Sequence, residues 1–310
     1  MSTETIKSIS NLKKQSIFFV IWKRNRIALL FLSPWLLGLA VFTAMPMITS
    51  FYMSFTSYDM FTTPKWVGMS NYTSMFDDIR FQKSMKVSFT YVFIGVPLQL
   101  IFALMLALLL NRGIKGLSFF RAVYYIPSLL GGSVGIAILW RQVYGKEGIF
   151  NDLIILLGVE PKSWVTDPST SLYTLITLLI WQFGSPMIIF LAGLKQIPSE
   201  LYESASIDGA GAVRKFTKIT FPLLTPIVLF NLVMQVISAF QAFTPAFIVG
   251  GSNGGALDST LFYTLYLYIQ AFNQFRMGYA SAMAWVLLLI IASLTALLFL
   301  SAKRWVHYES

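Results

Sequence analysis

Few residues of this chain are of the types that carry out catalysis. The single histidine, His307, lies near the C-terminus, and the sequence contains no cysteine. Disulfides, thiolate metal sites and cysteine nucleophiles are therefore excluded, and one histidine cannot build a histidine-rich metal centre. We expect neither a catalytic residue nor a metal ligand in this chain.

One pattern resembles a hydrolase nucleophile, but its surroundings argue against that chemistry. The run Gly131-Gly132-Ser133-Val134-Gly135 matches G-x-S-x-G, whose serine requires a strand–turn–helix and a histidine partner. Here the pattern lies inside an apolar run without charges, and two glycines four residues apart are typical of close helix packing. The sequence also lacks the phosphate-binding pattern G-x-x-x-x-G-K-[ST], so we expect that the chain does not itself hydrolyse ATP.

Two groups of uncharged polar side chains lie within apolar stretches. Asn231, Gln235 and Ser238 are spaced four and three residues apart, so a helix places them on one face. The second group lies in the preceding apolar stretch and comprises Trp181, Gln182 and Ser185. An aromatic ring with neutral hydrogen-bonding groups suits a sugar, whereas amides inside membranes also link neighbouring helices. Both interpretations remain open at this point.

The composition predicts the elements that hold these side chains. Of the 310 residues, 56% are apolar and only 12% charged, whereas about a quarter of a soluble domain is charged. The mean hydropathy is +0.69. Six uncharged runs have about the 20 residues that a bilayer span needs, at 27–49, 87–110, 122–140, 172–194, 223–249 and 278–300. Because the runs are continuous rather than alternating, they predict an all-α, polytopic membrane protein with six transmembrane helices over 27–300.

The distribution of lysine and arginine predicts the orientation of these spans. With the N-terminus inside, 15 of the 23 Lys and Arg residues fall in cytoplasmic segments and 8 in outer loops, as the positive-inside rule requires. This orientation gives cytoplasmic tails at 1–26 and 301–310 and three longer outer loops. Because the basic residues border the spans, we expect the lipid bilayer with its anionic headgroups, rather than nucleic acid, as their partner.

The cytoplasmic loop at 195–222 is longer than a tight turn between spans. Its sequence predicts two short helices separated by a bend. Ser199 is the expected N-cap of the first helix, and Gly209 and Gly211 supply the bend. The second helix is predicted over 212–219. Such an element can dock onto another protein or lie on the membrane surface, and the physical argument alone does not choose between them.

The sequence of this loop is similar to the EAA signature of the membrane subunits of binding-protein-dependent ABC importers. That signature reads E-A-A-x-x-x-G and, after nine residues, I-x-L-P. The chain departs from it by a serine for alanine and a phenylalanine for leucine, and the matching set is Glu203, Ser204, Ala205, Gly209, Ile219, Phe221 and Pro222. The resemblance implies an ATPase-coupling segment made of Glu203, Ser204, Ala205, Asp208, Gly209, Ala210 and Gly211.

Further stretches extend the resemblance to most of the chain and to the carbohydrate-uptake branch, which includes the maltose and glycerol-phosphate permeases. Around the loop the chain reads L-A-G-L-x-x-I-P-x-E-L-Y-E-x-A-x-I-D-G-A. The other matching stretches are Trp66-Val67-Gly68-x-x-Asn71-Tyr72, Gly148-Ile149-Phe150-Asn151 and Gly278-Tyr279-Ala280-x-Ala282. The resemblance implies the fold of a type I importer transmembrane domain in the bacterial cell membrane.

The resemblance also implies a mechanism and a set of partners. A sugar, most simply an oligosaccharide, would cross the membrane by alternating access. The partners would be a second homologous permease forming a heterodimer, two ABC ATPase subunits that bind ATP and Mg, and an extracytoplasmic solute-binding protein. No cofactor is expected in this chain. The helix-face pattern and the resemblance together predict a substrate pathway lined by Trp181, Gln182, Ser185, Asn231, Gln235, Ser238, Ala239 and Ala242.

Two other functions are weighed against this one. An importer permease for a different polar solute fits the same motifs, since nothing in the spans specifies a sugar. A secondary carrier would need inverted repeats or charged groups inside the membrane, and neither is apparent in the sequence.

Overall fold

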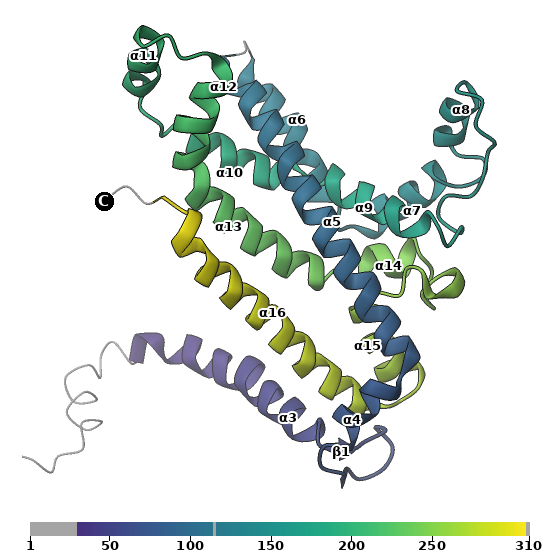
Figure 1. Ribbon diagram of the computed structural model, residues 1–310. Helices are drawn as coiled ribbons and strands as arrows, with labels where there is room; N and C mark the ends of the chain where they lie inside the picture. Colours follow the sequence, from purple (N-terminus) through teal and green to yellow (C-terminus); the bar gives the residue numbers. More distant parts are fainter. Residues whose placement is uncertain (1–29, 114–115, 308–310) are drawn as a thin grey trace, which may run out of the picture. The chain divides into compact units, whose positions relative to one another are not determined.

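The computed structural model of the chain describes residues 30–113 and 116–307 (Figure 1). The predicted tail at 1–26 lies outside these residues. The described part is almost entirely helical, as the sequence predicts. Four of its helices are long and apolar enough to cross a membrane, or six if each of two bent helix pairs forms one span. The chain divides into two compact units, 1–53 and 54–310, which are described separately.

The first unit contains one candidate span, the helix Leu30–Met53. It includes a π-helical turn, η2 (Ala40–Ala44), and ends with α3 (Met45–Met53). None of its residues in these two elements is buried, and large apolar side chains such as Phe31, Trp35 and Phe42 are exposed. A helix that is apolar on all sides is typical of a membrane span.

The second unit contains the remaining helices. Before the first long helix lie β1 (Thr56–Ser57), β2 (Lys65–Trp66) and α4 (Ser70–Asp77). The other elements are α5 (Ile79–Leu110), α6 (Leu117–Leu130), α7 (Val134–Val143), α8 (Ile149–Ile155), α9 (Ser171–Trp181), α10 (Gly184–Leu194), α11 (Ser199–Ile207), α12 (Ala212–Lys215), η3 (Phe216–Thr220), α13 (Phe221–Phe240), α14 (Thr244–Ile248), η4 (Ala256–Asp258), α15 (Tyr263–Tyr268), η5 (Ile269–Asn273) and α16 (Met277–Trp305).

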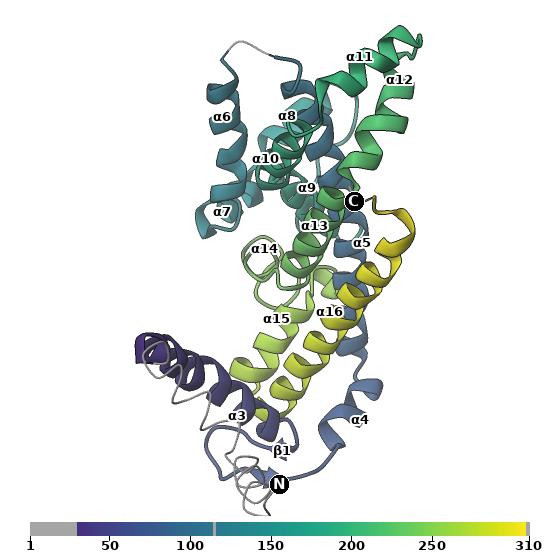
Figure 2. The same cartoon turned by 90° about the vertical axis from the view of Figure 1, so that its left-hand side faces the viewer.

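Helix α5 forms the centre of this unit. It packs against α9, α10, α13 and α15 (Figures 1 and 2). Its buried side chains recur every three or four residues, as in Val92, Val96, Leu100, Ala103 and Ala107, so they form one stripe along the helix. The small side chains in this stripe allow the neighbouring helices to approach closely.

The third predicted span is not a continuous helix. Helices α6 and α7 are bent by 96° at a short break that coincides with Gly131, Gly132 and Ser133. Ser133 caps α7, because its Oγ accepts a hydrogen bond from the backbone N–H of Ile136 at 3.3 Å. A Cβ at Gly131 would lie 2.2 Å from the side chain of Gln182. The G-x-S-x-G pattern thus forms a helix break with a close packing contact at Gly131. A Cβ at Gly135 would meet no atom within 4 Å, so the predicted packing through both glycines is not found among the described residues.

The loop at 195–222 and the fifth span also differ from the sequence prediction. The helix predicted over 212–219 does not end before Pro222, because α12, η3, α13 and α14 together form one candidate span, Ala212–Ile248. Pro222 removes a backbone donor, and the π-helical turn that precedes it accommodates the interruption. The fourth span consists of α9 and α10, bent by 41°.

A small antiparallel hairpin precedes α4. Its two strands pair Thr56 with Trp66 and Ser57 with Lys65. Asn71 donates two hydrogen bonds of 2.9 Å, to the carbonyl oxygens of Ser54 and Thr56. The backbone of Gly278 lies so close that a Cβ there would be 1.9 Å from the carbonyl oxygen of Thr56. Two of the stretches that carry the family resemblance therefore hold this hairpin against the start of α16.

Candidate functional site

The predicted coupling segment is an exposed helix with a defined C-terminal cap. In α11 and the turn after it, Glu203, Ser204 and Asp208 are exposed. The helix ends in a Schellman motif, because the N–H of Ala210 bonds to the carbonyl of Ala205 at 2.8 Å and the N–H of Gly209 bonds to that of Ser206 at 3.1 Å. Such a motif requires a left-handed residue.

Gly209 is that left-handed residue. Its φ is +73°, and a Cβ at this position would meet no atom within 4 Å. The glycine is therefore needed for its backbone conformation and not for lack of space. Gly211 has an extended backbone with φ −71° and begins α12. The predicted bend is confirmed at Gly209, whereas Ser199 is not the N-cap, because that position is occupied by Pro198 without a side-chain hydrogen bond.

Two hydrogen bonds brace α11 against the start of the fifth span. The hydroxyls of Tyr202 and Thr220 lie 2.9 Å apart, and the Nζ of Lys215 donates to the Oγ of Ser206 at 2.6 Å. A cavity of about 490 Å³ lies where α11, α12 and η3 meet the ends of α5 and α10. The bracing holds α11 in place while its other side stays exposed.

Two exposed apolar side chains, at the end of α11 and in α12, were not expected from the sequence. Ile207 is 87% exposed and Val213 is 78% exposed. Single exposed apolar side chains are ordinary on protein surfaces, so these two add apolar area in and next to the predicted coupling segment without by themselves marking a docking surface. A window of sequence does not reveal them, because both residues look like ordinary buried positions of short amphipathic helices.

The predicted pathway residues of the fourth span lie at the break between α9 and α10. Pro186 has no N–H, so it leaves the carbonyl of Gln182 without its helical donor. Gln99 of α5 donates to this carbonyl at 3.0 Å, and Ser128 of α6 donates to it at 2.8 Å. Ser128 also accepts from the backbone N–H of Ser185 at 2.8 Å. This break is therefore fixed by side chains from two other helices.

The predicted pathway residues of the fifth span have different surroundings. Asn231 is fully buried and donates to the carbonyl of Pro186 at 3.5 Å, while its Oδ1 has no partner among the described residues. Gln235 is half-buried and Ser238 is exposed. Ala239 is buried and Ala242 half-buried. Asn231 thus lies between α10 and α13, whereas the side chains of Gln235 and Ser238 stay partly or fully accessible.

Trp181 belongs to a row of aromatic side chains. Its ring lies 5.7 Å from that of Trp140, which lies 5.3 Å from Tyr144. The row continues through Phe150 to Trp164 at centroid distances of 4.7 and 5.4 Å. The aromatic rings connect the fourth span to the segment that contains α8. All five rings are half-buried. Each ring therefore packs against its neighbours on one part of its surface and stays accessible on another.

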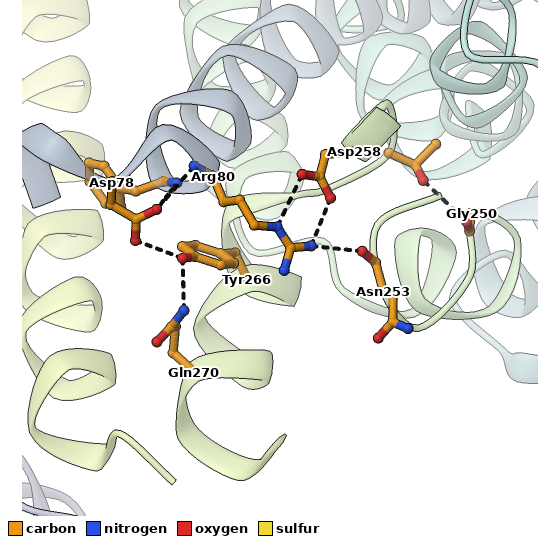
Figure 3. Close-up of polar contacts among 9 residues, drawn as sticks. Asp78, Arg80, Gly250, Asn253, Asp258, Tyr266 and Gln270 are labelled. Atoms are coloured by element: carbon orange, nitrogen blue, oxygen red, sulfur yellow. Dashed lines mark hydrogen bonds and ion pairs between the residues drawn. The ribbon is translucent and has the colours of Figure 1, made fainter. Parts of the chain in front are cut away.

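A polar cluster that the sequence analysis did not identify lies where α5 begins (Figure 3). Asp78 caps α5 and accepts from the backbone N–H groups of Arg80 and Phe81 at 3.0 and 3.1 Å. Its other oxygen accepts from the hydroxyls of Tyr266 and Tyr279 at 2.6 and 2.7 Å. The cluster thereby joins α5, α15 and α16.

The cluster keeps the carboxyl of Asp78 ionised. Burial raises the pKa of Asp78, but the hydrogen bonds from Tyr266, Tyr279 and the backbone lower it by more, so the pKa lies below its ordinary value of 3.8. A lowered carboxyl pKa stabilises the folded state above pH 3.8, and this contribution is lost as the pH falls through the folded value. The cap is therefore fully formed at neutral pH.

Arg80 fastens the loop before η4 to the same cluster. Its guanidinium bonds to Asp258 through two nitrogens, at 3.0 and 2.7 Å, and to the carbonyl of Asn253 at 3.0 Å (Figure 3). The short helix η4 that follows this loop is strained, because its residues Leu257 and Asp258 both have positive φ, of 54° and 55°, which costs about 1–2 kcal/mol for each such residue. We call the ion pair between Arg80 and Asp258 the clamp. Leu257, which precedes Asp258, is 81% exposed, so the clamp lies beside an apolar side chain that points outward.

We expect Arg80→Ala to release this loop. Limited proteolysis of the purified chain should then cleave within 250–258 faster. Asp258→Ala should have a smaller effect of the same kind, because Arg80 still bonds to the carbonyl of Asn253. Since the ion pair is already lost in Arg80→Ala, the double variant should be cleaved no faster than Arg80→Ala alone. The control is Lys83→Ala, which removes an exposed cation one turn later on α5. Additive effects of the two variants would show that the two side chains act independently.

The comparisons with known proteins agree on one family. Residues 80–307 match the family described as binding-protein-dependent transport system inner membrane component. The chain is 53% identical over 290 residues to the probable ABC transporter permease protein YesP of Bacillus subtilis strain 168, covering 93% of this chain and 94% of that protein. It is 31% identical over 297 residues to the arabinooligosaccharides transport system permease protein AraP of the same organism, covering 94% and 93%.

A more distant relative and a solved structure extend the comparison. The trehalose/maltose transport system permease protein MalF of Thermococcus litoralis is 31% identical over 261 residues, covering 83% of this chain and 86% of that protein. The crystal structure of a bacterial ABC transporter that imports the acidic polysaccharide alginate contains a chain with a TM-score of 0.78 and 20% identity, covering 93% of this chain and 99% of that chain. At that identity the structural likeness shows the fold alone.

Proposed function

Because the chain belongs to the family of binding-protein-dependent transport system inner membrane components, we propose that it forms half of the translocation pathway of an ATP-driven oligosaccharide importer. It is a sugar-type ABC transporter permease and a multi-pass membrane protein. The observation that supports coupling to ATPase subunits is α11, an exposed helix that ends at the left-handed Gly209 and is braced against the fifth span. ATP binding and hydrolysis belong to the partner subunits.

The coupling segment transmits movement through these contacts. A partner that grips the exposed side of α11, at Glu203, Ile207 and Asp208, can move the helix as a rigid piece. The bonds from Tyr202 to Thr220 and from Ser206 to Lys215 pass that movement to the helix that continues into α13. Since α13 packs against α5 and α10, the displacement reaches the centre of the bundle.

The pathway is proposed to follow the accessible face of α13 that carries Gln235 and Ser238, which supply neutral hydrogen-bonding groups. Ala242, a small residue, follows the end of α13, and Trp181 and Ser185 belong to the neighbouring span. Asn231 and Gln182 instead hold the helices around the α9–α10 break. The runs 172–194 and 223–249, which carry the proposed pathway residues, contain no charged side chain, and this favours a neutral solute. An arabinooligosaccharide permease among the relatives supports an oligosaccharide.

Co-purification from native membranes tests the assembly. We expect a tagged chain to bring with it a second, different permease and an ABC ATPase, and to bind an extracytoplasmic solute-binding protein when substrate is added. A solved relative in complex with a pentasaccharide-bound periplasmic protein supports that last partner. Recovery of the chain alone, or with a second copy of itself and no ATPase, would contradict the proposed heterodimeric importer.

The proposed orientation places both termini in the cytoplasm. The chain contains no cysteine, so single cysteines can be introduced at Ser10 and at Ser252, which is exposed in the loop before η4. An impermeant thiol reagent should label only position 252 in intact cells, and both positions after permeabilisation. Labelling of position 10 in intact cells would show that the N-terminus lies outside, which contradicts the proposed orientation. This experiment also shows whether the Arg80–Asp258 clamp lies on the outer side.

A further inference from the structure

We infer that the groove between α5, α13 and α16 binds an anionic phospholipid, with an acyl chain in the groove and the phosphate at Lys303 and Arg304. This site is independent of the transported solute. It requires only that α16 crosses the bilayer, and it holds for either orientation of the chain.

The groove is a built feature of three packed helices. Helix α13 packs against both α5 and α16, and the groove has a volume of about 410 Å³, within the range of about 300–1,000 Å³ that is typical of ligand pockets. Phe93 and Pro97 line it from α5, Leu232 and Val236 from α13, and Leu297 and Ser301 from α16. Nearly all its lining is hydrocarbon, so a hydrocarbon chain is the complementary occupant.

The polar end of the groove identifies the rest of the ligand. Ser301 lies at that end, and Arg304 follows it by three residues, so the two share a face of α16. Lys303 lies farther around the helix, and its long side chain can extend its charged end to the same headgroup level. Lys303 and Arg304 are exposed, and within the described ranges neither forms an ion pair. Helix α16 contains no acidic residue. Two unpaired cations at the end of a span attract an anionic headgroup.

Trp305 marks the depth of this end in the membrane. Its indole N–H donates to the Oγ of Ser301 at 3.3 Å, and tryptophan is enriched where the hydrocarbon core meets the headgroups. An acyl chain in the groove therefore has its ester and phosphate groups at the level of Lys303 and Arg304. A second permease seated in the groove would instead leave these cations without an anionic partner.

Site-specific photo-crosslinking tests the occupant directly. A benzophenone amino acid replaces Leu297 in the groove or, as a matched control, Leu289, which lies two turns earlier on α16, does not line the groove and is farther from the two cations. Both side chains are 59% exposed, so they are equally accessible. The full transporter is reconstituted in vesicles of equimolar phosphatidylglycerol and phosphatidylcholine, illuminated, and analysed by mass spectrometry for lipid adducts.

We expect the adducts at position 297 to be enriched in phosphatidylglycerol by roughly 5- to 30-fold over those at position 289, because two cations contribute to the preference. Lys303→Gln with Arg304→Gln should abolish the enrichment. The control is Lys83→Gln with Lys86→Gln, which removes the same amount of charge near the start of α5, away from the end of α16. This double variant should preserve the enrichment. Equal adducts at both positions, enrichment that survives loss of the two cations, or a crosslink from position 297 to a partner protein would each overturn the inference.

Discussion

Gly209→Val is expected to abolish coupled uptake while the chain still inserts and assembles. Valine strongly disfavours the φ of +73° that the Schellman motif requires, so the turn after α11 must change its course. The helix then no longer presents Glu203 and Ile207 at the angle set by its two bracing hydrogen bonds. ATP hydrolysis and sugar uptake should therefore separate, with hydrolysis losing its dependence on the loaded solute-binding protein.

A second glycine provides a matched control for this prediction. Gly158 has nearly the same conformation, with φ +77°, and a Cβ there would also meet no atom within 4 Å. It follows α8, far along the chain from the coupling segment. Gly158→Val therefore imposes a similar backbone cost of about 1–2 kcal/mol without touching α11. Uptake and hydrolysis are measured together in proteoliposomes, and equal losses in the two variants would show that strain alone explains the effect.

The family, the helical class and the membrane location could be predicted from sequence because each depends on local composition. The EAA-like segment is contiguous, so its glycine and small residues identify it without any structure. The physical reason for Gly209 was also available, since only a left-handed residue ends a helix in that way. The exposure of Ile207 and Val213 could not be predicted from sequence, because it depends on which side chains the rest of the chain leaves uncovered.

Long-range polar contacts could not be predicted in the same way. The carbonyl freed by Pro186 is satisfied by Gln99 and Ser128, which lie 83 and 54 residues before Gln182. The clamp between Arg80 and Asp258 joins residues 178 positions apart. The 96° break between α6 and α7 is equally invisible to hydropathy, because glycine and serine interrupt a helix without introducing any charge.

These contacts also separate two roles that a single sequence pattern combined. Asn231 and Gln235 are both amides on one helix, yet Asn231 is fully buried against Pro186, whereas Gln235 is half-buried without a partner among the described residues. An unpaired amide inside a membrane protein needs water, a neighbouring protein or a substrate. Gln235 is therefore the position where a change should affect transport rather than folding.

We expect Gln235→Leu to reduce sugar uptake roughly 2- to 10-fold, as the loss of one hydrogen bond of about 0.5–1.5 kcal/mol predicts, while the unfolding temperature of the chain stays the same. Gln235→Asn should restore part of the uptake because it keeps an amide. The contrasting variant is Ser128→Ala, which removes a donor to the Gln182 carbonyl and the acceptor for the Ser185 N–H. That change should destabilise the chain by about 1–3 kcal/mol. The contrary outcome is that Gln235→Leu lowers the unfolding temperature or the recovery of the second permease while uptake per assembled transporter is normal. Gln235 would then hold helices together, and the pathway would lie elsewhere.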